Sequence, residues 1–198
     1  MGLHIHSISK IPMDLEKEYY LYLLEFGPRD PFSEALRACF DEMADWASRS
    51  NSVVVRGTDR IHFEDEVFSY HEVNGLDGNE ILPAILISTI NPHAFNEQHK
   101  LGRYRDDDRL IIIPLRKFVD NSDQVYGFVR KLLAELKAGK NLSDIEVIKP
   151  RSRSIGKRLL DSIVLQPNFI GIGVDLKSLF ITKTANKSGM PLRGAPDL

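Results

Sequence analysis

A strand–helix–strand pattern over residues 19–55 constrains the fold of this chain most. Residues 19–26 read YYLYLLEF, a short apolar run closed by a glycine and a proline, which predicts a buried strand. Asp30, followed by a proline, predicts a capped helix start, and apolar residues at helical spacing extend this helix over 31–49. Residues 52–55, SVVV, predict a second buried strand. Two strands joined by one helix indicate a right-handed parallel crossover.

The rest of the chain continues this alternation of strands and helices. Residues 58–73 fit either a short helix or a strand. Strands are expected at 81–89, with Pro83 near its start, and at 110–115, where Pro114 indicates an edge strand or a strand end. The other expected elements are a helix at 123–138 that Ser122 caps and Gly139 closes, a short strand at 145–148, a helix at 154–165 and a strand at 169–174.

Length and composition indicate one domain in a reducing compartment. We expect a single α/β domain over residues 19–182, preceded by a leader or edge strand at 1–18 and followed by a mobile tail at 183–198. The single cysteine excludes an internal disulfide, and no apolar run approaches the roughly 20 residues that span a bilayer. Net charge is −2, which gives the whole molecule no electrostatic attraction to polyanions. A cytoplasmic protein without a membrane role is therefore expected.

The element order over residues 19–138 resembles the thioredoxin-like fold. The strand YLYLLEF leads into a helix through FGPRDPF, where that family keeps its redox motif, and ILPAI around Pro83 is similar to the family's cis-proline strand start. The resemblance implies a mixed sheet of about four to six strands flanked by helices, with a helix–strand extension at 139–182. Residues 27–30 read GPRD where the family has C-x-x-C, and Cys39 falls on the apolar helix face, so a non-redox protein is implied.

Two segments of this framework are candidates for contact with a partner. Arg29 lies beside the expected helix start, where free N–H groups favour an anion, although the carboxylate of Asp30 is expected to take that place as a cap. The long polar loop at 91–108 carries Arg103, Tyr104 and Arg105, a mixture that suits a protein contact better than catalysis; a variable loop without function is the alternative.

A basic segment at 149–158 is the candidate for nucleic acid or a phosphorylated ligand. It carries five cations and no acid: Lys149, Arg151, Arg153, Lys157 and Arg158. Such a segment can bind phosphates, and a solvated helix start is the alternative. The absence of an interleaved aromatic residue argues against base stacking.

An acidic and histidine-rich cluster at 62–72 is the only candidate for catalysis. A metal-dependent hydrolase would use Glu64 and Glu66, with His62 or His71. A helix would bring His62 and Glu66 onto one face, and a strand would bring His62, Glu64 and Glu66 onto one face, but His71 leaves that face in both cases. A solvated surface is therefore the competing interpretation. The sequence contains no phosphate-binding loop and no nucleophile-elbow motif.

These observations favour a binding module over an enzyme. The first hypothesis is a non-redox, thioredoxin-like domain that binds a protein partner or its own copy, with Pro83 among the candidate contact residues. Binding of nucleic acid or phosphate through 149–158 and hydrolysis by the 62–72 cluster remain the alternatives. No cofactor and no metal is expected.

Overall fold

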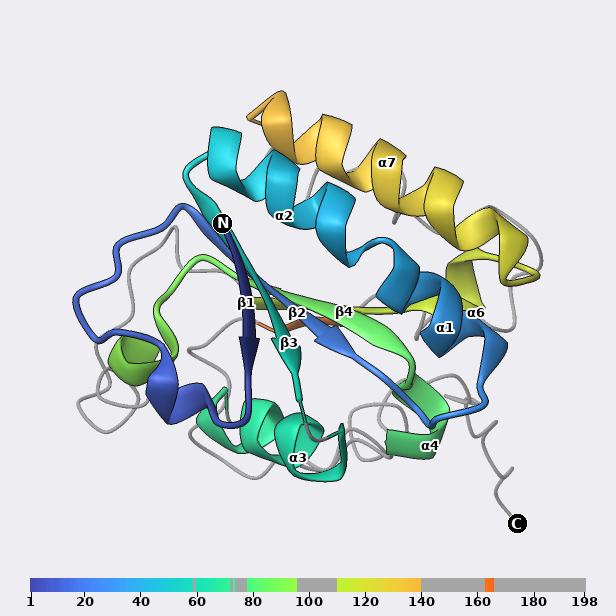
Figure 1. Cartoon of the computed structure of the whole chain (residues 1–198), viewed down its shortest axis with the longest axis horizontal. Coiled ribbons are helices and arrows are strands. Elements are labelled where there is room, and N and C mark those ends of the chain that lie inside the picture. The colour runs from blue at the N-terminus through green and yellow to red at the C-terminus, as the bar shows by residue number, and fades with distance from the viewer. Residues whose placement is uncertain (59, 72, 74–77, 96–109, 140–162, 166–198) are drawn as a thin grey trace, which may run out of the picture.

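A computed structural model of the chain describes residues 1–58, 60–71, 73, 78–95, 110–139 and 163–165. Its six strands form one mixed sheet in the order β1-β3-β2-β4-β5-β6, flanked by helices on both faces (Figure 1). The strands are β1 (Gly2–Ile5), β2 (Tyr19–Leu24), β3 (Ser52–Gly57), β4 (Ala84–Ser88), β5 (Leu110–Pro114) and β6 (Ile163–Leu165). The helical elements are η1 (Ile8–Lys10), α1 (Pro31–Ala38), α2 (Phe40–Arg49), α3 (Arg60–Tyr70), α4 (Gly78–Ile81), α6 (Leu115–Phe118) and α7 (Asp123–Lys137).

The strand–helix–strand order and the parallel pairing predicted over residues 19–55 are confirmed. Strands β2 and β3 are parallel neighbours, and Asp30 caps α1 by accepting the Ser33 N–H at 2.8 Å. The expected single helix is wrong in one respect, because it breaks at Cys39 into α1 and α2. The Cys39 N–H bonds to the Leu36 carbonyl at 3.1 Å, which stops the i→i−4 ladder, and the thiol donates to the carbonyl of Ala35 at 3.3 Å.

The second half of the sheet is antiparallel. Strand β4 pairs with β2 on one side and with β5 on the other. It begins at Ala84, later than expected, because the Leu82 N–H donates to the Gly78 carbonyl in the helical turn of α4, and Pro83 has no N–H for the ladder. The Leu82–Pro83 peptide bond is cis. Pro114 is the last residue of β5.

Helix α7 and strand β6 each depart from the sequence-based expectation. Ser122 precedes α7 without a side-chain capping bond; Asn121 Oδ1 accepts the Gln124 N–H at 3.2 Å instead. Gly139 ends the segment with φ of +69°, a conformation that suits glycine. Residues 163–165, expected at the end of a helix, form β6 antiparallel to β5. The other elements expected beyond residue 139 lie outside the described residues.

Strand β1 extends the sheet at its other edge. It runs parallel to β3, with Gly2 opposite Val54 and Ile5 opposite Gly57. The His4 ring is hydrogen-bonded through Nε2 to the Gly57 carbonyl at 3.2 Å. Residues 1–18 therefore include an edge strand, which was one of the two alternatives.

The sheet separates two apolar cores. Alternate residues of β2 point to opposite faces, so Leu21 and Leu23 pack under α1, α2 and α7, whereas Tyr20 and Tyr22 pack toward η1 and α3. Figure 1 shows α1, α2 and α7 on one side of the sheet and α3 on the other. Both faces of the central strands are buried, which leaves the strand ends as the places where polar side chains gather.

Candidate functional site

A cleft lies at the edge of the sheet where β2 and β3 end. Because the two strands are parallel, their carboxyl ends meet at one edge, which is where open α/β sheets commonly bind ligands. The cleft has a volume of about 730 Å³. The described residues that line it are Glu25, Phe26, Gly27, Pro28, Thr58, Glu64, Asp65, Gly78, Asn79 and Leu82.

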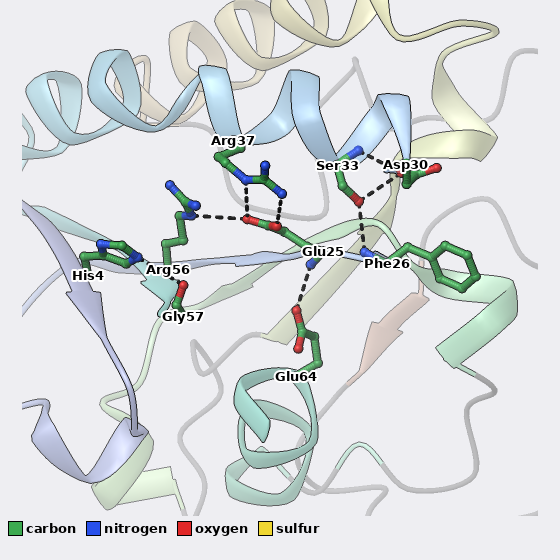
Figure 2. A network of polar contacts seen from close by, with 9 residues as sticks. All are labelled: His4, Glu25, Phe26, Asp30, Ser33, Arg37, Arg56, Gly57 and Glu64. Atoms are coloured by element: carbon green, nitrogen blue, oxygen red, sulfur yellow. Dashed lines mark hydrogen bonds and ion pairs between the residues drawn. The ribbon is translucent and has the colours of Figure 1, made fainter. Parts of the chain in front are cut away.

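One of the lining residues, Glu25, has a buried carboxylate bound by two arginines. The Glu25 side chain is only 3% exposed. Arg37 of α1 donates from Nη2 to Oε2 at 2.5 Å and from Nε to Oε1 at 3.3 Å, and Arg56 of β3 donates from Nε to Oε1 at 3.2 Å (Figure 2). The hydrogen bond to Glu25 raises the pKa of the Arg37 guanidinium. A buried charge needs such partners, so Glu25 joins three separate elements behind the cleft.

A second carboxyl, that of Glu64, reaches the same point from α3. Its Oε1 accepts the Glu25 N–H at 3.0 Å, and Glu64 is 6% exposed (Figure 2). Burial raises the pKa of Glu64 to about 7, and the nearby charges of Glu25 and Asp65 add to this rise, while backbone hydrogen bonds oppose it. The carboxyl is therefore present in both protonation states near neutral pH.

The loop after Glu25 is tied to the start of α1. Ser33 Oγ accepts the Phe26 N–H at 2.9 Å and donates to Asp30 Oδ2 at 2.9 Å. Arg116 pairs with Asp30 and lies over the Phe26 ring, 5.8 Å from its centre. The Phe26 side chain remains 47% exposed at the rim of the cleft. The loop therefore exposes an aromatic ring, while the N–H groups of residues 25 and 26 are hydrogen-bonded to Glu64 and Ser33.

The partner-contact candidates from the sequence are distributed unevenly. Arg29 is exposed in the loop beside the cleft, and Asp30 caps α1 as expected. Pro83 is buried, and its carbonyl accepts the Leu115 N–H at 2.9 Å. The others lie outside the described residues: Arg103, Tyr104, Arg105, Lys149, Arg151, Arg153, Lys157 and Arg158.

The acidic and histidine-rich cluster at 62–72 lies on α3 and just after it, and its side chains diverge. Glu64 points to the end of β2, whereas Glu66 accepts from Ser7 Oγ and the Ile8 N–H, both at 2.7 Å, and so anchors η1. His62 is exposed. No group of three or more metal-binding side chains comes together in the described part of the chain.

His71, from the same cluster, is enclosed in the core. Its Nδ1 bonds to the Val67 carbonyl at 2.8 Å, and its ring meets those of Tyr22 and Phe95 at centre distances of 4.9 and 5.3 Å. Burial lowers the pKa of His71 to about 4, so the ring is neutral at physiological pH.

The single cysteine is a core residue, as the sequence predicted. Cys39 is 0% exposed, and burial raises the pKa of its thiol to about 11. A thiol–disulfide reaction needs an accessible thiolate, and this thiol is neither accessible nor ionised.

Sequence reasoning missed the pairing of Glu25 with its two arginines. Glu25 stood at the end of an apolar run, where it resembled an ordinary strand terminus. The usable signal was positional: Glu25 and Arg56 lie near the carboxyl ends of two strands predicted to be parallel. Arg37 carried no comparable signal.

No family model matches the sequence, and comparisons with curated proteins and with solved structures give no match. Among the described helices, none is both long and apolar enough to cross a membrane.

Proposed function

We propose that the chain is a non-redox, thioredoxin-like domain of a reducing compartment, such as the cytoplasm, that binds a protein partner or its own copy through the cleft. Support for this fold comes from the order β3-β2-β4-β5, with α1 and α2 between β2 and β3 and α7 after β5. This is the element order on which the sequence resemblance rests. The buried thiol of Cys39 supports the non-redox part of the proposal.

The exposed Phe26 carries the proposal of protein binding. Large exposed apolar side chains in the described residues are those of Met13, Phe26 and Tyr126, and of these only Phe26 lines the cleft. Aromatic side chains at preorganised positions are enriched among the residues that dominate protein–protein affinity. The bonds that Glu64 and Ser33 make hold the backbone that carries this ring before any partner arrives.

The test is selection of binding peptides, followed by a matched pair of variants. A displayed library of random peptides is panned against the purified protein, and selected peptides are measured by fluorescence anisotropy. Phe26→Ser should weaken binding about tenfold or more, as for a central aromatic contact, whereas Met13→Ser should leave it unchanged. Sedimentation of both variants and the parent tests binding to a second copy.

Two results contradict the proposal. One is a library without binders together with a monomer at every concentration. The other is equal affinity of the selected peptides for the parent and Phe26→Ser, because the site would then lie elsewhere.

A further inference from the structure

We propose that the cleft selects a protein segment in which a lysine or arginine adjoins a bulky apolar residue, with the cation placed between Glu64 and Asp65. This inference rests on the proposed function and names the partner's chemistry. It is carried by the charge of the lining, by the burial of Glu64 and by the apolar rim.

The lining of the cleft carries a net negative charge even when Glu25, which is paired with two arginines, is left out. Glu25 is bound by Arg37 and Arg56. Glu64 and Asp65, adjacent on α3, both line the cleft, and neither forms an ion pair in the described part of the chain. The described lining residues include no lysine, arginine or histidine. A cation is the complementary ligand for such a surface.

Glu64 supplies a second and independent reason. It is 6% exposed and lines the cleft, and its Oε1 accepts the Glu25 N–H. Burial disfavours the charged form of this carboxyl, and an ammonium or guanidinium group from a ligand offsets that cost by providing a charge-assisted donor. Asp65, the next residue of α3, is exposed and also lines the cleft, so it adds a second negative charge to the lining.

The other lining residues of the cleft indicate that the ligand also has an apolar part. Phe26, Pro28 and Leu82 line the cleft, and Phe26 is half exposed. A leucine- or phenylalanine-sized side chain adjoining the cation covers this surface. The long stem of lysine or arginine buries further apolar area while its charged end reaches the carboxylates.

The charged groups around Glu64 make this binding depend on pH. Glu25 faces it from the end of β2 and Asp65 from α3 itself, and both raise its pKa; Arg56 of β3 faces Glu25, and η1 is bonded to Glu66 instead. A cation needs Glu64 ionised. With a pKa of about 7, roughly 3% of Glu64 is ionised at a pH of about 5.5 and most of it at about 8. The affinity should therefore rise about thirtyfold between these two pH values.

The experiment uses three peptides of one frame. The probes are acetyl-Leu-Lys-Leu-Phe amide and the same peptide with norleucine or glutamate in place of lysine. Each is titrated into the isotope-labelled full chain, and amide shifts at Phe26, Thr58 and Asn79 report occupancy of the cleft. We expect the lysine peptide to bind at least tenfold more tightly than the norleucine peptide at pH 8, and to lose this preference at pH 5.5.

Two variants and one control variant test whether Glu64 and Asp65 cause the preference for lysine. Glu64→Gln should abolish both the lysine preference and its pH dependence, and Asp65→Asn should reduce the preference, whereas Asp41→Asn, on the exposed surface of α2, should change neither. Equal binding of the lysine and norleucine peptides at the cleft amides would overturn the inference and leave the proposed function intact. An unchanged preference in Glu64→Gln would overturn it as well. If no peptide moves the cleft amides and the library also fails, the proposed function falls instead.

Discussion

Replacing Glu64 by glutamine should change how stability depends on pH. The pKa of the Glu64 carboxyl is about 7 in the folded chain and 4.5 as its ordinary value, because burial disfavours the charged form. Between these values the folded state holds a proton that the unfolded state has lost. The stability that this carboxyl supplies is therefore fully present below pH 4.5 and is lost as the pH rises through 7. A span of this size corresponds to about 3 kcal/mol.

The parent protein alone conceals this effect because His71 acts in the opposite direction. Burial lowers the pKa of His71 to about 4, from an ordinary 6.5. The stability linked to this ring is present above pH 6.5 and is lost as the pH falls through 4. Between pH 4.5 and 6.5 the two residues offset each other, so the test must compare two variants at each pH.

Urea unfolding of the parent and Glu64→Gln, followed by circular dichroism at several pH values, isolates the contribution of Glu64. Glutamine keeps an oxygen that can accept the Glu25 N–H. Relative to the parent, Glu64→Gln should gain about 3 kcal/mol in unfolding free energy as the pH rises from 4.5 to 8. Asp41→Asn is the control and should show no such gain. A constant difference between the parent and Glu64→Gln at every pH would refute the reasoning.

Three further predictions concern packing around the site. Glu25→Ala should lower the unfolding free energy by about 3 kcal/mol, the lower end for a broken buried ion pair because both arginines keep some contact with water; a loss below about 1 kcal/mol in urea would contradict the role of the network. A Cβ at Gly57 would lie 2.5 Å from Cβ of Phe63, so Gly57→Ala should cost about 1–3 kcal/mol in thermal unfolding, whereas Gly27→Ala, whose Cβ meets nothing within 4 Å, should cost less. Cys39 should resist a thiol reagent until urea is added, and rapid labelling of the native chain would disprove its burial.

Local patterns in the sequence predicted most of the central fold. The parallel pair β2 and β3 and the Asp30 cap follow from short-range signals, namely an apolar run, a capping residue and helical spacing. Nothing in the sequence indicated the helix break at Cys39, because apolar residues continue at helical spacing across it. Ile163–Leu165 was misassigned because a short apolar run fits a helix or a strand, and its pairing with β5 decides between them.

The site was harder to predict than the fold because its contacts are long-range. Glu64 was selected as a catalytic candidate together with Glu66, since the two are close in sequence. On α3 they point to different elements, and the functional neighbour of Glu64 is Glu25, which lies 39 residues earlier. Charge pairs between distant segments depend on register and helix phase, which composition and spacing do not specify.

The backbone of the loop at 26–29 is anchored by Glu64 bonded to the Glu25 N–H, by Ser33 bonded to the Phe26 N–H and by the Asp30 N–H bonded to the Gly27 carbonyl. None of these hydrogen bonds uses a side chain from the loop itself. Four consecutive residues can therefore be randomised while the backbone beneath them keeps its shape. The same scaffold would then present a new surface for each sequence, much as an antibody framework carries its variable loops.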